Sequence, residues 1–229
     1  MYKNLFIDLD DTVINTAQNA HNTFVEMYEK HQFQRYFDSF NHFYSIYQTT
    51  NTQVWKAYEK NEITKEQLNE IRFSTPLLQV GVENTTLANQ FMADFFEVIS
   101  IQKEVMPHAH EGLSYLAERY TLHILSNGFS GLQQKKMKAA GVDIYFDSLF
   151  LSDEIGAHKP SPEIYHHALK RANADVNSSI MIGDNWTNDV AAAKAIGMDQ
   201  IYYTPKVETT LAFEPTFVMN DWLEVKKWL

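Results

Sequence analysis

The stretch Leu5-Phe6-Ile7-Asp8-Leu9-Asp10-Asp11-Thr12 decides the fold class of this chain. It starts as a short apolar run and becomes acidic within a few residues. A short, wholly apolar run is typical of a β-strand that is buried on both faces, as in a parallel sheet. Carboxylates placed directly after such a strand lie at the carboxyl edge of the sheet, where open α/β folds bind their ligands.

Similar apolar runs follow, and helix-length stretches separate the later ones. The runs are Leu122-His123-Ile124-Leu125, Leu149-Phe150-Leu151, Ile180-Met181-Ile182 and Ile201-Tyr202-Tyr203. The stretches are Ser130 to Ala140, a segment opened by Ser161-Pro162-Glu163, and Asp189 to Ile196. This alternation indicates βαβ units and predicts an α/β fold built on a parallel sheet. Near the end, Thr216-Phe217-Val218-Met219 predicts an edge strand, and a last helix is expected from Asp221 onward.

Residues 15–104 interrupt this rhythm, because no run of comparable strand character occurs there. Aromatic residues recur instead at steps of three and four, which is the spacing of one helix face. They are Phe33, Tyr36, Phe37, Phe40, Phe43, Tyr44 and Tyr47. We interpret the stripe as packing within an all-helical insertion in preference to a surface that stacks on a nucleobase, and it stays open whether one or two of its members face the site. Thr64 is the candidate cap of a helix in this insertion.

Charge and cysteine content exclude several classes of protein. The 229 residues include 19 Lys+Arg and 29 Asp+Glu, so the net charge is 19 − 29 = −10. An acidic surface repels phosphate backbones and argues against nucleic-acid binding. A small anionic substrate stays open, because a local cation can outweigh a distant net charge. The absence of cysteine excludes thiol nucleophiles and Cys-type metal sites.

The sequence shows no targeting or membrane segment. No apolar stretch approaches the roughly 20 residues of a membrane helix, and the N-terminal run is too short for a signal peptide. We therefore expect a soluble, cytoplasmic protein without a membrane partner. The sequence leaves its oligomeric state open.

Polar groups stand at the ends of the predicted strands, and together they suggest one site. They are Asp8, Asp10 and Thr12; Ser126-Asn127-Gly128; Lys159 before Pro160; and Asp184 with Asp189. Taken singly, each set fits a plainer role: an acidic turn, an ordinary turn, a surface lysine or an N-cap aspartate. Together they supply carboxylates, a hydroxyl, backbone N–H groups and an ammonium, which suit a hard cation and a phosphate. Oxygen ligands alone select Mg²⁺ as that cation.

The order of these motifs resembles that of the haloacid dehalogenase superfamily of hydrolases. The motifs that carry the resemblance are Asp8-x-Asp10-x-Thr12, Ser126-Asn127, Lys159-Pro160 and Gly183-Asp184 with Asp189. The insertion is similar to the helical C1-type cap of that superfamily. The resemblance implies a Rossmann-like three-layer core with a parallel sheet, formed by residues 1–14 and 105–229. It also implies an all-helical cap domain at residues 15–104, inserted after the first strand.

The same resemblance implies a role for each motif residue. Asp8 would be the nucleophile that forms an aspartyl-phosphate, Asp10 the general acid and then base, and Lys159 the neutralising cation. The residues expected around the phosphoryl group are Thr12, Ser126, Asn127 and Gly128. The expected Mg²⁺ ligands are Asp8, the backbone carbonyl of Asp10, Asp184 and Asp189, the last of them directly or through water. Neighbouring carboxylates are expected to raise the pKa of Asp10.

A narrower resemblance points to the 5′-nucleotidases of that superfamily. It rests on Asn51-Thr52-Gln53-Val54-Trp55, Ile63-Thr64 and Arg72-Phe73 in the insertion, and on Ser126-Asn127-Gly128-Phe129 with Gln133 and Lys136. It implies small phosphorylated metabolites as substrates, among them pyrimidine nucleoside 5′-monophosphates. Asp10 favours phosphoester chemistry over dehalogenation, because a dehalogenase has no alkoxide to protonate.

Two other functions stay open at this point. A phosphosugar mutase would keep both aspartates and would move phosphate within a sugar. A regulatory or binding protein on the same fold is disfavoured by the intact motifs, although fold similarity alone does not exclude it. A metal site at His108-x-His110 is disfavoured, because no further ligand cluster accompanies these histidines.

Overall fold

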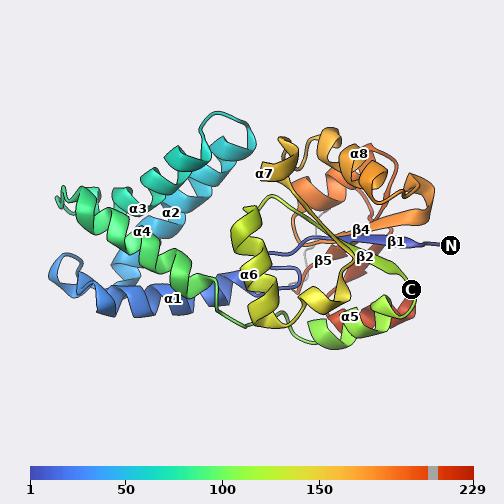
Figure 1. Cartoon of the computed structure of the whole chain (residues 1–229), viewed down its shortest axis with the longest axis horizontal. Helices are drawn as coiled ribbons and strands as arrows, with labels where there is room; N and C mark the ends of the chain where they lie inside the picture. Colours follow the sequence, from blue (N-terminus) through green and yellow to red (C-terminus); the bar gives the residue numbers. More distant parts are fainter. Residues whose placement is uncertain (206–210) are drawn as a thin grey trace. The chain divides into compact units, whose positions relative to one another are not determined.

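The computed structural model describes residues 1–205 and 211–229 of the chain. It divides into two compact units, one formed by Met1–Thr16 with Lys103–Leu229 and the other by Ala17–Gln102. We call them the core unit and the helical unit (Figure 1). The insertion expected at residues 15–104 extends two residues beyond the helical unit at each end.

In the described part of the chain, six strands form one parallel sheet, which lies in the core unit. They are β1 (Asn4–Ile7), β2 (Thr121–Ser126), β3 (Ser148–Leu151), β4 (Ser179–Gly183), β5 (Asp199–Tyr203) and β6 (Phe217–Met219). The predicted parallel sheet is therefore confirmed, and each apolar run lies in one of its strands. The predicted edge strand is β6, which pairs with β5.

The order of the strands, β3-β2-β1-β4-β5-β6, creates a topological switch point between β1 and β4. From β1 the chain proceeds outward to β2 and β3 on one side, and from β4 it proceeds to β5 and β6 on the other. Ile7 of β1 pairs with Ile124 of β2 and with Ile182 of β4. The residues that follow these strands therefore emerge beside one another, at the edge where α/β sheets bind ligands.

Helices cover both faces of the sheet, so the core is three-layered and Rossmann-like (Figure 1). Alternate residues of β1 serve opposite faces. Leu5 and Ile7 belong to one apolar cluster together with Leu113. Phe6, which lies between them, belongs to a second cluster together with Ile164. All five side chains are completely buried, and such burial contributes about 1.5–3 kcal/mol for each.

The helices of the core unit follow the strands along the chain. The α-helices are α5 (Ala109–Ala117), α6 (Ser130–Ala140), α7 (Ser152–Ile155), α8 (Pro162–Arg171) and α9 (Ala192–Ala195). The 3₁₀ helices are η2 (Asp143–Tyr145), η3 (Val176–Ser178) and η5 (Trp222–Lys227). The helix expected from Asp221 onward is thus a 3₁₀ helix, and the Asp221 side chain caps it by accepting from the Leu223 amide at 2.8 Å.

One connection differs from the helix predicted at Asp189 to Ile196. After β4 the chain forms a π-helix, η4 (Trp186–Ala191), which continues into α9. Asn185 caps η4, because its side chain accepts from the amides of Thr187 at 3.0 Å and Asn188 at 2.9 Å. Asp189 is therefore not an N-cap, and its carboxylate is available for other partners.

The helical unit contains no strand, and all of its residues are described. Its elements are most of α1 (Thr16–Lys30), η1 (Phe33–Arg35), α2 (Phe40–Glu59), α3 (Lys65–Gln79) and α4 (Thr85–Ile99). Thr64 caps α3 as predicted, in a capping box with Gln67. The caps of α2 and α4 are the side chains of Ser39 and Asn84. Each cap satisfies an amide that the first turn of a helix leaves without a partner.

The predicted aromatic stripe packs inside the helical unit, but it does not lie on one helix. Phe33 belongs to η1, whereas Phe43 and Tyr47 belong to α2, because the chain bends between the two elements. Tyr36, in the bend, is 40% exposed. The buried rings pack against one another, and two of them contact Phe24 of α1, whose centroid lies 4.1 Å from that of Tyr47 and 5.8 Å from that of Phe43. The stripe therefore forms the core of the unit.

The insertion begins and ends on neighbouring segments of the core unit. Ile14 forms an antiparallel bridge with Val105. The amide of Asn15 donates to the carbonyl of Glu104 at 3.0 Å. The two connections are therefore held side by side by backbone hydrogen bonds.

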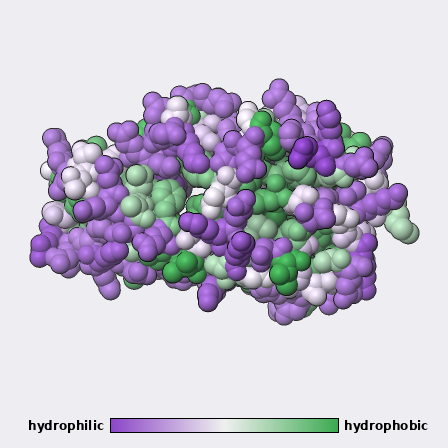
Figure 2. All heavy atoms as spheres, viewed as in Figure 1, coloured by the Kyte–Doolittle hydropathy of each residue, from purple (hydrophilic) through white to green (hydrophobic). Residues whose placement is uncertain are grey.

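The visible face of the molecule in Figure 2 is mainly hydrophilic, in agreement with the net charge of −10. Large exposed apolar side chains are spread along the sequence, from Val25 and Ile71 to Ile144 and Leu223. Among the described residues, the helices are too short or too polar to cross a membrane.

Candidate active site

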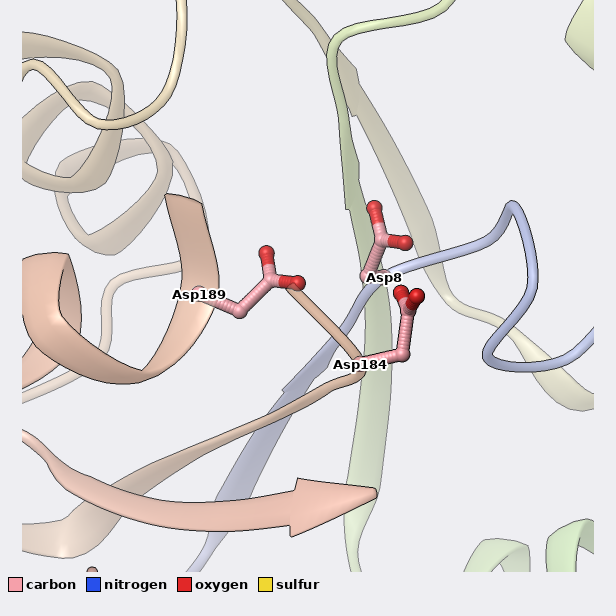
Figure 3. A group of neighbouring side chains, drawn as sticks. All are labelled: Asp8, Asp184 and Asp189. Atoms are coloured by element: carbon pink, nitrogen blue, oxygen red, sulfur yellow. The ribbon is translucent and has the colours of Figure 1, made fainter. Parts of the chain in front are cut away.

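Three carboxylates meet at the switch point of the sheet (Figure 3). Asp8 follows β1, Asp184 follows β4, and Asp189 is presented by η4. Each offers one oxygen such that the three oxygens lie within 4.8 Å of one another. The backbone places Asp8 directly, since its amide donates to the Ile182 carbonyl of β4 at 2.9 Å.

Lys159 supplies the ammonium of this cluster. Its Nζ donates to Asp8 Oδ1 and to Asp189 Oδ1, both at 2.6 Å, and its side chain is only 3% exposed. The backbone of Lys159 is fixed by Asn127, which accepts from the Lys159 amide at 2.8 Å and donates to its carbonyl at 2.9 Å. The side chain of Asn127 therefore fixes the loop that carries the ammonium, a role that differs from the backbone N–H contact expected of Asn127.

Burial and like charge dominate the electrostatics of the cluster. Burial raises the pKa of Asp8 well above its usual value; Lys159 offsets part of this effect, and the carboxylates of Asp189 and Asp184 add to it. Burial, together with the charge of Asp189, raises the pKa of Asp184 to about 7. Burial alone would lower the pKa of Lys159, but the carboxylates of Asp189 and Asp8 reverse this and raise it. The cluster therefore holds more negative charge than one ammonium can compensate.

The charge of the cluster fits a hard divalent cation. Asp8, Asp184 and Asp189 contribute −3 when ionised and Lys159 contributes +1, so −3 + 1 = −2 remains. Carboxylate oxygens are the ligands that Mg²⁺ prefers, usually one or two of them with water and substrate oxygens. Among the residues that the structure describes, this is the one group of three or more acidic or histidine side chains whose ligand atoms all lie within 4.8 Å of one another.

Thr12 connects the turn after β1 with the turn after β4. Its hydroxyl donates to Asp184 Oδ1 at 3.0 Å and accepts from the Asp184 amide at 3.0 Å. The same hydroxyl lies 3.5 Å from Asp8 Oδ2. The carbonyl of Thr12 accepts from the indole N–H of Trp222 at 2.8 Å. Thr12 therefore fixes the position of Asp184 relative to Asp8.

Asp189 is completely buried and is held by its own turn. Its Oδ2 accepts from the Asn185 amide at 3.0 Å. A Cβ atom at Gly183 would lie 2.3 Å from the same oxygen, so that only glycine leaves room for this carboxylate. The hydroxyl of Tyr165 donates to the carbonyl of Asn188 in η4. The motif Gly183-Asp184 with Asp189 predicted this turn, whereas nothing in the sequence predicted the contact that Tyr165 makes with it.

Asp10 lies apart from the cluster and has partners of its own. Its Oδ1 forms an ion pair with Lys136 and accepts from the Thr16 hydroxyl at 2.5 Å. Its Oδ2 accepts from Gln133 Nε2 at 2.6 Å. Burial favours the neutral acid, but the ammonium of Lys136 and these hydrogen bonds outweigh it and lower the pKa of Asp10. The expected rise in the pKa of Asp10 is therefore wrong, because an ammonium, not a carboxylate, is its nearest charge.

Ser126 and Gly128 lie beside Asp10, at the end of β2. The hydroxyl oxygen of Ser126 accepts from the Gly128 amide at 3.0 Å and from Gln133 Nε2 at 2.9 Å. A Cβ atom at Gly128 would lie 2.1 Å from that nitrogen. The structure thus brings every predicted site residue to one edge of the sheet, in two groups, one around Lys159 and one around α6.

The histidine pair is not part of this site. His108 Nδ1 lies 2.7 Å from Asp221 Oδ2, and His110 Nδ1 lies 3.3 Å from the Tyr145 hydroxyl. The two rings have separate partners, and no metal-binding group in the described ranges includes them.

Comparison with known proteins agrees with the fold and with the motifs. Residues 2–197 match the family model of haloacid dehalogenase-like hydrolases. The chain belongs to this family of hydrolytic enzymes.

The relatives within the family cover most of the chain. HAD-hydrolase YfnB of Bacillus subtilis (strain 168) is 25% identical over 209 residues, which are 90% of this chain and 86% of that protein. Pyrimidine 5′-nucleotidase PynA of Streptococcus pneumoniae (strain ATCC BAA-255 / R6) is 27% identical over 98% of this chain and 93% of its own. Pyrimidine 5′-nucleotidase YjjG of Escherichia coli (strain K12) is 31% identical over 66% of each chain.

Solved structures show the same fold. The crystal structure of YfnB from Bacillus subtilis, bound to magnesium, superposes with a TM-score of 0.88 at 23% identity and covers 99% of this chain and 97% of that one. L-2-haloacid dehalogenase from Xanthobacter autotrophicus has a TM-score of 0.76 at 18% identity, over 99% and 98% of the two chains. At this level of identity the likeness concerns the fold alone.

Proposed function

We propose that this hydrolase is a Mg²⁺-dependent phosphatase that acts through an aspartyl-phosphate on Asp8. The observation that carries the proposal is the pair of aspartates after β1. Asp8 lies in a cluster with surplus negative charge, whereas Asp10 is held separately by Lys136. A nucleophile and an acid–base group need such separate surroundings, because they must ionise differently during the reaction.

In the first half-reaction, a carboxylate oxygen of Asp8 attacks the phosphorus of a phosphomonoester. The new bond joins Asp8 to phosphorus, and the bond from phosphorus to the ester oxygen breaks. The leaving oxygen takes the proton of the Asp10 carboxyl and departs as an alcohol. A phosphate dianion beside Asp10 adds negative charge and raises the pKa of Asp10, so substrate binding itself favours the protonated acid.

In the second half-reaction, water attacks the phosphorus of the aspartyl-phosphate. Asp10, now a carboxylate, takes a proton from that water, and the bond between phosphorus and Asp8 breaks. Inorganic phosphate leaves, and Asp8 is again a carboxylate. Asp10 then again carries the proton with which the first half-reaction begins.

Asp8, Asp184 and the backbone carbonyl of Asp10 would hold Mg²⁺, with Asp189 as a direct ligand or a partner through water. When bound, the cation neutralises the surplus charge of the cluster and allows a phosphate to approach. Lys159 stabilises the charge of Asp8 and of the transferring group, since phosphoryl transfer depends mainly on positioning and charge neutralisation. The phosphoryl group would be oriented by the Ser126 hydroxyl and by the backbone amides of Asn127 and Gly128. The Thr12 hydroxyl would hold the turn that carries Asp184.

Small phosphorylated metabolites are the proposed substrates, and pyrimidine nucleoside 5′-monophosphates are the first to test. The relatives named pyrimidine 5′-nucleotidase support this choice. We further propose that the helical unit is the cap domain that the resemblance to the superfamily implies. Its two connections leave the core unit side by side, as a hinge requires, and interdomain movement is reported for YfnB.

The test is phosphate release from a panel of nucleoside monophosphates and sugar phosphates, with and without Mg²⁺. Release that requires Mg²⁺ and disappears in Asp8→Asn is the expected result. Isomer analysis of the same reactions separates hydrolysis from a mutase, because a mutase would form an isomer without free phosphate. Phosphate release by Asp8→Asn at the wild-type rate would contradict the proposal.

A further inference from the structure

Helix α6 presents two buried polar side chains to Asp10 and Ser126. We propose that these two, Gln133 and Lys136, are positioning residues for phosphoryl transfer: they fix the carboxylate of Asp10 and direct the hydroxyl proton of Ser126. The inference rests on the proposed function, because it assigns what holds the acid–base group of that reaction.

Gln133 joins the two groups with a single amide. Its Nε2 donates to Asp10 Oδ2 at 2.6 Å and to Ser126 Oγ at 2.9 Å. A side-chain amide has two N–H donors on one nitrogen, and a carboxylate can only accept, so the nitrogen must face Asp10. Both donors are used in this way, and the side chain is 1% exposed.

The hydrogen bonds of Ser126 leave its hydroxyl as a donor. The hydroxyl oxygen accepts from Gln133 Nε2 and from the Gly128 amide. A serine hydroxyl has two lone pairs and one proton, so both acceptor positions are occupied. The proton is left for an acceptor such as a phosphoryl oxygen. Gln133 therefore orients a phosphate-binding hydroxyl and the acid–base carboxylate at once.

Lys136 completes the fixation of Asp10. It lies three residues after Gln133 on α6, so the two side chains share one helix face. Its ammonium pairs with Asp10 Oδ1 and lies 3.4 Å from the Thr16 hydroxyl, which also donates to Asp10 Oδ1. Each oxygen of Asp10 thus has its own donors, and the carboxylate cannot rotate without breaking them.

Gly128 gives Gln133 its place. A Cβ atom at residue 128 would lie 2.1 Å from Gln133 Nε2 and 2.5 Å from its Cδ, which forces the amide to move. The φ of Gly128 is not among the left-handed values of this chain, so the backbone allows alanine, and the three atoms nearest to its Cβ would all belong to Gln133. Gly128→Ala is therefore an independent way to displace the amide.

Positioning of Asp10 matters most when the leaving oxygen needs a proton. A nucleoside 5′-monophosphate must release an alkoxide, which leaves only with the proton from Asp10. p-Nitrophenyl phosphate releases a stabilised phenolate, which leaves without one. Loss of positioning should therefore slow phosphoryl transfer to Asp8 much more from the nucleotide than from the aryl ester, whereas general damage to the site should slow both transfers alike.

The experiment compares kcat/KM for these two substrates in Gln133→Met, Lys136→Met and Gly128→Ala. This ratio reports the steps up to departure of the leaving group and not the later hydrolysis of the aspartyl-phosphate, which needs Asp10 for both substrates. The matched controls are Gln134→Met and Lys135→Met, whose native side chains lie exposed on the same helix. We expect kcat/KM for the nucleotide to fall about 100-fold in the three variants, as for lost acid–base catalysis. For the aryl ester it should fall less than about tenfold, and Lys136→Arg should regain part of the loss. Equal losses for both substrates, or losses as small as in the controls, would overturn the inference.

Crystal structures of the wild type and Gln133→Met add a readout that does not depend on turnover. The Asp10 carboxylate should leave its wild-type position in the variant, and an unmoved carboxylate would overturn the positioning role. If the wild type released phosphate from neither substrate, the proposed function would fail. The structures would then still decide whether α6 holds Asp10.

Discussion

Asp8 and Asp10 leave the same strand two residues apart, yet their surroundings are opposite. Asp8 shares the ammonium of Lys159 with Asp189 and lies near Asp184. Asp10 has the ammonium of Lys136 as its partner. Burial and like charge raise the pKa of Asp8, whereas Lys136 lowers the pKa of Asp10 against the effect of burial.

This contrast shows how one turn can carry two kinds of chemistry. Surplus negative charge is concentrated where a divalent cation would bind and where a nucleophile is needed. The carboxylate that must give and take protons, Asp10, is instead paired with the ammonium of Lys136. The positions of Lys159 and Lys136, rather than the number of aspartates, therefore give Asp8 and Asp10 their different roles.

Replacing the nucleophile should have the largest effect. Asp8→Asn should lower phosphate release by about 10⁴-fold or more, because an amide cannot form the phosphoryl intermediate. The variant should nevertheless fold, since it removes one charge from an over-negative cluster. Phosphate release and thermal unfolding are measured together, with Asp11→Asn as the control of equal charge change. A folded variant with substantial activity would remove Asp8 as the nucleophile.

Metal removal should have the second largest effect, because it takes away the cation that the Asp8 cluster needs for activity. Chelation with EDTA should reduce phosphate release to background, and Mg²⁺ should restore it. Mg²⁺ should also raise the Tm of the wild type, since a ligand at 100 times its Kd adds about 2.7 kcal/mol to stability. Asp184→Asn should lose most of this rise. A chelated enzyme that keeps its activity would contradict the assignment of Mg²⁺.

The two lysines should differ in their contribution to stability. Lys159→Met leaves Asp8 and Asp189 without a cation in the interior, and breaking a buried ion pair costs about 3–5 kcal/mol. Lys136→Met leaves only Asp10, whose side chain is 33% exposed, and should cost less. Urea unfolding of the metal-free variants measures both, with Lys135→Met as the exposed control. A larger loss for Lys136→Met would reverse the comparison.

The pH dependence of the metal-free protein should give the smallest signal. The pKa of Asp184 in the folded state is about 7, above the ordinary value near 4. Its protonated form therefore stabilises the fold below about pH 4, and this contribution is lost as the pH rises through about 7. The raised pKa of Asp8 acts in the same direction.

Urea unfolding of EDTA-treated protein at pH 5 and pH 8 checks this sign. Asp184→Asn should flatten the dependence, and Asp147→Asn, which changes an exposed carboxylate, should not. A metal-free protein whose stability rises over this range would show that the carboxylates are better compensated than the structure indicates.

The sheet and the motif residues could be predicted because their signals are local. A buried strand is an apolar run, and a carboxylate directly after it can lie only at the edge of the sheet. Asp8, Asp184 and Lys159 therefore converge as expected. Thr64 is a similar case, because a capping residue acts on the turn that follows it.

The surroundings of Asp10 could not be predicted in this way. Gln133 and Lys136 lie more than 120 residues along the chain from it. Helical spacing shows that the two share a face, but the packing of α6 decides that this face meets Asp10. The sign of the pKa shift of Asp10 depends on that contact, which is why counting nearby aspartates predicted the wrong sign. The bend after η1, which divides the aromatic stripe, could not be predicted either, because aromatic residues continue to recur at steps of three and four across it.

The division of roles between Asp8 and Asp10 is tested most directly by Asp10→Asn with p-nitrophenyl phosphate. Asp8 can still attack this substrate, but no base remains to activate water, so the aspartyl-phosphate should accumulate. We predict a burst of p-nitrophenolate equal to the enzyme concentration, followed by slow turnover. Mass spectrometry should then find one phosphoryl group on the peptide that contains Asp8. The absence of a burst, or a phosphoryl group on another peptide, would contradict the account.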